Sequence, residues 1–130
     1  RDRYEEGTWT PTITFSVSNG NMSYVARAGK YIKIGNMVFC EGSVRISETT
    51  ASGYLTFSGF PFLSANVSNQ TSCVKFMPYG WTGITNGSVE AYIDANTNSA
   101  PLFDNTGNRI TNTNSTSDCS LYFSFSYSTT

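Results

Sequence analysis

The sequence predicts an all-β protein, an antiparallel β-sandwich of the jelly-roll type. Apolar and polar residues alternate along about eight to ten short segments, which is the pattern of strands with one buried face. Glycine, asparagine and proline separate these segments roughly every 8–12 residues, as turns do in sandwiches. No segment repeats apolar residues at helical spacing over three turns, so no helix is expected.

The strands are expected, in order, at 12–17, 24–27, the two arms of a hairpin over 31–47, 54–58, 73–77, 89–95, 101–104 and 119–128. The strand at 24–27 is expected to break at Gly29. Pro61 is expected to mark the end of the strand at 54–58, because proline cannot donate to a central ladder.

The hairpin is centred on Gly35-Asn36, a pair suited to a two-residue turn because glycine accepts a positive φ. If Ile34 pairs with Met37, Ile32 falls opposite Phe39. Two sets of side chains then lie on opposite faces: Ile32, Ile34, Met37 and Phe39 on one, and Val38, Cys40, Val44 and Ile46 on the other. Neither face is polar. We therefore expect one face to line the core and the other to lie under a second sheet or against another chain.

Length and charge narrow the class of protein. With 130 residues, we expect one domain over 8–130, preceded by a linker over 1–7 from an earlier module. Since the chain begins at Arg1 without an initiator methionine, we expect a fragment of a longer protein. Only 13% of residues are charged and the net charge is −1, so no electrostatic basis exists for a nucleic-acid partner. No apolar window reaches the length of about 18 residues that membrane insertion needs.

The cysteines and the absence of histidine limit the chemistry. Three cysteines without close spacing do not indicate a disulfide framework. Cys40 and Cys119 are in phase with apolar neighbours, so we expect buried free thiols, with a bridge between these two as the alternative. The chain has no histidine, which removes the commonest general base and metal ligand. No cofactor is expected.

The carboxylates do not predict a catalytic pair. Glu90 and Asp94 share a strand face, but their Cβ atoms would be roughly 13 Å apart, too far for glycoside hydrolysis. We expect solvated carboxylates and no enzyme activity. Asp94, Asn96 and Asn98 alternate as in a calcium loop, yet the glycine and closing glutamate of that loop are missing. No metal site is therefore expected.

Aromatic residues near polar loops point to a carbohydrate surface. Tyr79 and Trp81 lie in a segment rich in glycine and proline, and aromatic rings pack on the apolar faces of sugars. The candidate ligand-binding residues are Tyr79, Trp81, Tyr92, Asp94, Asn96 and Asn98. The alternative for Trp81 is a structural residue that packs over the end of a sheet.

Several stretches together resemble a known family. They are YEEGTWTPT at 4–12, GKYIKIGNMVF at 29–39, FSGFPF at 57–62, ITNTN at 110–114 and LYFSFSY at 121–127. In this order and spacing they resemble the C-terminal domains of bacteriophage tail fibres and tailspikes. Phe60 stands where leucine is usual in the family, and 63–100 has no counterpart that we can name. Trp9, beside Pro11, is expected to anchor the domain where it meets a preceding shaft.

The resemblance implies a homotrimeric tip domain of a virion fibre, which acts outside the cell. Such a domain would hold three chains together and contact a polysaccharide of the host surface. Two alternatives remain: a purely structural trimerisation cap, and a carbohydrate-binding module of a bacterial hydrolase. Any enzyme would lie upstream.

Overall fold

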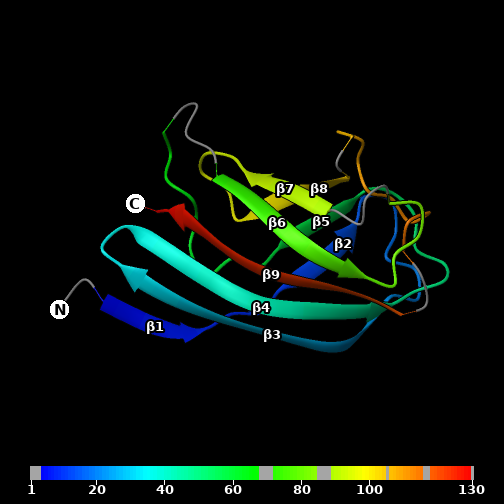
Figure 1. Ribbon diagram of the computed structural model, residues 1–130, viewed down its shortest axis with the longest axis horizontal. Coiled ribbons are helices and arrows are strands. Elements are labelled where there is room, and N and C mark those ends of the chain that lie inside the picture. Colours follow the sequence, from blue (N-terminus) through cyan, green and yellow to red (C-terminus); the bar gives the residue numbers. More distant parts are fainter. Residues whose placement is uncertain (1–3, 68–71, 85–88, 105, 116–117, 130) are drawn as a thin grey trace.

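The computed structural model describes residues 4–67, 72–84, 89–104, 106–115 and 118–129, and these residues form nine strands and no helix (Figure 1). No described helix could therefore cross a membrane. The strands are β1 (Tyr4–Thr8), β2 (Thr12–Phe15), β3 (Ser23–Ile34), β4 (Met37–Ser47), β5 (Leu55–Ser58), β6 (Ser72–Tyr79), β7 (Val89–Ile93), β8 (Ser99–Asp104) and β9 (Cys119–Ser128).

All nine strands belong to one antiparallel sheet in the order β1-β3-β4-β9-β6-β7-β8-β5-β2. The strand β8 makes the sheet continuous, because residues 99–101 pair with β5 and residues 102–104 pair with β7. The sheet curls so strongly that β2 and β5 fold back behind β6 and β9 (Figure 1). The all-β, antiparallel prediction is confirmed. In place of the two sheets of a sandwich, however, a single sheet closes over its own core.

Aromatic rings fill the space inside the curl. Phe57 of β5 makes edge contacts with Phe76 and Phe123 at ring-centroid distances of 5.0 Å. Trp9 packs beside them, 5.8 Å from Phe57, and its indole N–H donates to the Lys30 carbonyl at 3.1 Å. Trp9 is buried, as expected of an anchor.

The strand expected to break at Gly29 instead runs on through it to Ile34. A Cβ atom at position 29 would lie 2.8 Å from Trp9 Nε1, and the Trp9 N–H donates to the Gly29 carbonyl. Gly29 therefore gives the indole room against an unbroken strand.

The predicted hairpin is confirmed in its register and its turn. Ile34 pairs with Met37, Ile32 pairs with Phe39, and Gly35 has a φ of 61°. The inward face lines the core, with Val38 at 0% exposure, whereas Phe39 on the outward face is 46% exposed.

Residues 4–7, expected in a linker, form most of β1, where Tyr4 lies opposite Ile34. Tyr4, Glu5 and Glu6 are all exposed, so this strand has no alternating apolar pattern by which the sequence could reveal it. Residues 1–3 of the expected linker lie outside the described residues.

All three cysteines are free, with Cys40 and Cys119 buried and Cys73 exposed. Cys40 lies opposite Phe125, six positions along β9 from Cys119, which is about 20 Å of strand. The alternative of a bridge between Cys40 and Cys119 is therefore wrong.

Candidate interaction surfaces on the outer face of the sheet

The face of the sheet that points away from the core carries large apolar side chains. On the hairpin, four of them form a contiguous group, which we call the hairpin patch: Ile32, Ile34, Met37 and Phe39. Tyr122 of β9 and Met77 of β6 pair across the same face and are also exposed. Exposed apolar groups of this extent commonly mark interaction sites.

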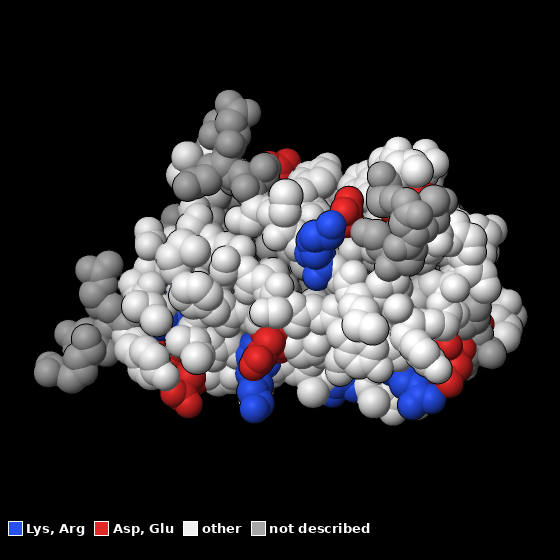
Figure 2. All heavy atoms as spheres, in the orientation of Figure 1, with Lys and Arg blue, Asp and Glu red and all other residues white. Residues whose placement is uncertain are grey.

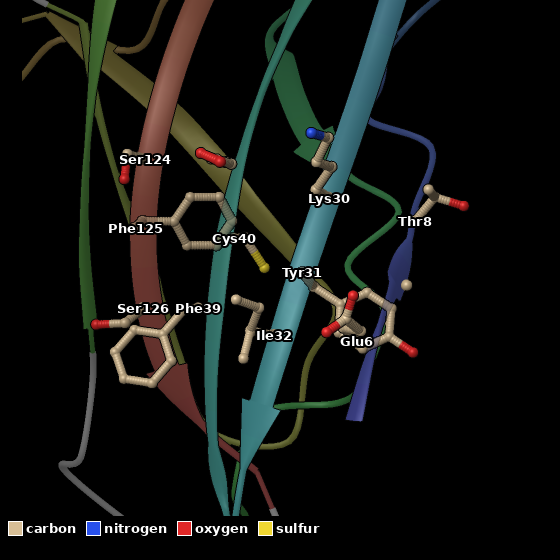
Figure 3. A pocket seen from close by; sticks show the side chains of 12 residues that line it. Glu6, Thr8, Lys30, Tyr31, Ile32, Phe39, Cys40, Ser124, Phe125 and Ser126 are labelled. Carbon is tan, nitrogen blue, oxygen red and sulfur yellow. The ribbon is translucent and has the colours of Figure 1, made fainter. Parts of the chain in front are cut away.

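A groove of about 760 Å³ crosses β1, β3, β4 and β9 beside the hairpin patch (Figure 3). Its side chains combine apolar, charged and hydroxyl groups: Ile32, Phe39, Glu6, Lys30, Glu41, Ser124 and Ser126. On the face of β3 opposite to Ile32, the Tyr31 hydroxyl donates to Glu5 Oε2 at 2.7 Å, and this hydrogen bond raises the pKa of Tyr31. The groove thus offers both apolar contact and polar partners.

Four charged side chains of the outer face lie in one row across the strands. Lys30 is paired in register with Glu41, and Lys75 with Glu90, whose Oε2 lies 3.0 Å from Lys75 Nζ. Phe123 pairs with Phe76, so the neighbouring Ser124 and Lys75 connect the two halves of the row. Figure 2 shows a mostly uncharged surface on which acidic and basic side chains stand side by side. The face therefore carries both signs of charge in alternation.

Two of the predicted sugar contacts lie at one end of β6. Tyr79 is its last residue, lies opposite Ser120 and is 68% exposed. Trp81 is half-buried against the core, and its indole N–H donates to the Ser120 carbonyl at 2.8 Å. This is the packing that the structural alternative for Trp81 predicts, and a sugar contact by either residue stays a prediction.

The other predicted contacts lie at the opposite end of β6. The loop 94–98, which carries Asp94, Asn96 and Asn98, follows β7 directly, and Ile93 of β7 pairs with Ser72 at the start of β6. Seven positions along β6, or about 23 Å, separate this end from Tyr79. The six residues therefore occupy two separate places on the sheet. The strand register that separates them cannot be predicted from local sequence.

Tyr92 has a neighbour that the sequence did not reveal. Its ring, 42% exposed, stacks on Phe103 of β8 with centroids 5.7 Å apart and planes inclined by 21°. The two rings border a hollow of about 540 Å³ over β6, β7 and β8, whose other side chains include Cys73, Lys75, Glu90 and Asp104. In the sequence, the alternation of Phe103 with Leu102, which is buried, is the pattern that could have predicted an outward-facing Phe103.

Three of the carboxylates are engaged in hydrogen bonds within the chain. Glu48 is buried, its Oε2 accepts the Ala51 N–H at 2.9 Å, and its Oε1 accepts the Ser115 hydroxyl. Arg45 donates two 2.7 Å hydrogen bonds to Asp118, which lower the pKa of Asp118 and raise that of Arg45. Hydrogen bonds from Thr106 likewise lower the pKa of Asp104. Within the described ranges, no cluster of three or more acidic, cysteine or histidine side chains could hold a metal ion.

Architecturally, the chain is an all-β domain built from one curled antiparallel sheet. This fold matches part of a solved protein, the crystal structure of Dettilon tailspike protein (gp208), with a TM-score of 0.75 and 16% sequence identity over 96% of the chain. The chain covers 24% of that tailspike chain. No protein-family profile and no curated protein matches the chain. The resemblance to tailspikes indicated by the sequence motifs is thus confirmed for the fold.

Proposed function

We propose that the chain is a domain of a phage tail fibre or tailspike, carried on the virion outside the cell. It joins three copies of itself and contacts a polysaccharide of the host surface. The fold shared with part of a tailspike supports the assignment to a virion protein. The exposed hairpin patch is the observation that carries the self-association.

The hairpin patch belongs to the most extensively paired strands of the sheet. The strands β3 and β4 are 12 and 11 residues long, so the backbone beneath the patch is held rigidly. Burying exposed isoleucine, methionine and phenylalanine against copies of the same face is favourable, since apolar area leaves water. The alternating charges beside the patch allow Lys30 of one copy to meet Glu41 of another.

The first prediction concerns mass in solution. Light scattering of the purified chain at micromolar concentration is expected to give three times the 14.2 kDa of one chain. A monomer at all accessible concentrations would contradict both the fibre-tip function and the purely structural cap. A monomer that binds glycans would instead favour the carbohydrate-binding module of a hydrolase.

Tyr92 supports glycan recognition. Its exposed ring is held in place by Phe103, and the polar loop 94–98 begins at the same end of the sheet. A ring with a fixed orientation and amide or carboxylate groups nearby can pack on a sugar and accept hydrogen bonds from its hydroxyls. The structural-cap alternative predicts no glycan binding at all.

The second prediction separates the two ends of β6. Tyr92→Ala is expected to weaken the affinity of the protein for host polysaccharide about tenfold, the equivalent of ~1.4 kcal/mol. Tyr79→Ala, at the other end of the strand, is the matched control and is expected to bind as the wild type. If both variants bound as tightly as the wild type, Tyr92 would not belong to the binding site. A loss of binding confined to Tyr79→Ala would place the site at the Tyr79 end of β6.

We propose no catalytic role for this domain. The hydrogen bonds that occupy Glu48, Asp104 and Asp118 support this proposal, because groups committed to the fold are poorly suited to exchange protons with a substrate. Incubation with host polysaccharide, followed by size analysis of the glycan, tests it, and a shortened glycan would contradict it.

A further inference from the structure

Beside Tyr92 and Phe103, an arginine lies between two aromatic rings. The guanidinium carbon of Arg109 is 4.7 Å from the centroid of Tyr54 and 5.6 Å from that of Phe103. Bridges from Phe103 to Arg109 and from Tyr54 to Thr111 insert this segment between β8 and β5. The Ile110 N–H also donates to the Leu102 carbonyl. The stacked row of Tyr54, Arg109, Phe103 and Tyr92 is called the Arg109 strip below.

The guanidinium of Arg109 has no anionic partner in the described part of the chain. None of the described carboxylates forms an ion pair with it, and its buried Nε has no hydrogen-bond acceptor. Arg45, by contrast, is already held by both carboxylate oxygens of Asp118. Arg109 is therefore oriented by its aromatic neighbours, and because its Nε is enclosed by the protein, its two outer nitrogens are the donors that a ligand can reach.

We propose that the Arg109 strip binds an anionic saccharide, whose carboxylate or phosphate group pairs with the guanidinium of Arg109. The exposed rings of Tyr54 and Tyr92 then pack on the sugar units on either side. This inference rests on the glycan recognition proposed above and names both its site and the class of its ligand.

An anion is preferred to a neutral sugar because of the geometry of the arginine. A planar guanidinium presents a rigid fork of N–H donors that matches two oxygens of a carboxylate or phosphate. Rings on both sides fix its plane before any ligand arrives, so little side-chain freedom is lost on binding.

A saccharide is preferred to a small anion because of the surface around the arginine. The strip continues from Tyr54 on one side to Tyr92 and the 540 Å³ hollow on the other. An extended ligand with apolar ring faces uses this whole length, whereas a bare ion would use only Arg109. In the competing structural role, Arg109 merely fastens its segment to β5 and β8, and glycan binding would not depend on it.

The test is a binding assay on the assembled protein with matched glycan pairs. The carboxylate pair is oligogalacturonate and galactose oligomers, and the phosphate pair is phosphomannan and mannan oligosaccharides. At least one anionic member is expected to bind tenfold or more tightly than its neutral partner. The member that binds identifies the carboxylate or the phosphate as the recognised group.

Variants assign the binding to the strip. Arg109→Gln is expected to lose at least tenfold in affinity for the anionic glycan, while Arg45→Gln on the same sheet is expected to bind as the wild type. Arg109→Lys keeps the charge without the planar fork and is expected to show an intermediate loss. It also serves as the readout if Arg109→Gln fails to fold, as judged from its melting temperature.

The outcomes separate this inference from the proposed function. Binding of the anionic glycans that survives Arg109→Gln unchanged would overturn the inference and leave glycan recognition standing. Failure to bind any of the four probes would overturn the inference. Glycan recognition itself would still be tested by the separate binding assay with host polysaccharide.

Discussion

The absence of a side chain at Gly29 lets Trp9 reach the core. The indole lies against the strand at that position, donates to the Lys30 carbonyl and packs on Phe57. A Cβ atom at position 29 would lie 2.8 Å from both the indole Nε1 and the backbone oxygen of Trp9, so any larger residue there would force Trp9 to shift. One glycine thus couples the entry of the chain to the aromatic core.

The three thiols differ in environment, which gives the third prediction. Burial raises the pKa of the Cys40 thiol to about 12, whereas Cys73 is exposed on β6. Iodoacetamide at pH 8 is expected to modify one thiol of the folded chain and all three in urea, because the thiolate is the reacting form. Peptide mass mapping should find the native modification on Cys73, and rapid native labelling of Cys40 would contradict the burial.

The same thiol links stability to alkaline pH. The pKa of Cys40 is raised on folding from 9.0 to about 12, so above pH 9 the unfolded chain binds fewer protons than the folded one. This contribution to the free energy of unfolding is complete below pH 9 and is lost as the pH rises towards 12.

Among the elements, the strand β2 shows how an edge of the sheet is closed. It is the last strand of the sheet and pairs only with β5. On its other side, the Tyr24 hydroxyl accepts the Ile13 N–H at 3.0 Å and donates to the Ile13 carbonyl at 3.1 Å, while Asn19 Oδ1 accepts the Phe15 N–H. Side chains thus satisfy backbone groups that could otherwise pair with another strand.

The fourth prediction tests this protection. Tyr24→Phe removes the hydroxyl and leaves the N–H and carbonyl of the buried Ile13 without it, so the free energy of unfolding is expected to fall by about 1–2 kcal/mol. Tyr4→Phe is the control, because the Tyr4 hydroxyl donates only to an exposed carboxylate, that of Glu6. Urea denaturation measures both, and equal stability of the two variants would show that the Tyr24 hydroxyl does not matter.

Elements with a strong local pattern could be predicted from the sequence. The hairpin register follows from Gly35 and the alternation around it, and the alternation over 119–128 gave the limits of β9. The double pairing of β8 could not be predicted, because partners in a sheet are chosen by tertiary packing. For the same reason, the sequence could not predict that the candidate sugar contacts, grouped there as one site, lie at two ends of β6. The Arg109 strip joins residues 54, 92, 103 and 109, which no local pattern connects.

At the scale of the whole molecule, curling gives the sheet two unlike faces. The inner face is sealed by its own strands β2 and β5, while the outer face has no such cover among the described residues (Figure 1). A single sheet that closes over one core leaves its hairpin patch exposed in the monomer. If the chain joins copies of itself as proposed, this patch is the apolar face that the monomer fold presents to them.

The fifth prediction tests that face. Phe39→Lys places a charge in the hairpin patch without touching the core, since the Phe39 ring points outward and its neighbours Val38 and Cys40 are buried. Burying an unpaired ammonium between copies is costly, so the variant is expected to remain folded but to dissociate, with a mass near one chain by light scattering. Its melting temperature is then expected to stop depending on protein concentration.

Val17→Lys is the matched control for Phe39→Lys. Val17 is also apolar and is 76% exposed, but it follows β2 and lies outside the hairpin patch. Its variant is expected to keep the wild-type mass, so that a loss of assembly in Phe39→Lys reflects the position of the charge and not its addition. If Phe39→Lys remained trimeric and Val17→Lys dissociated, the interface would lie near the β2 edge, and the hairpin patch would have to be covered by something other than a copy of the chain.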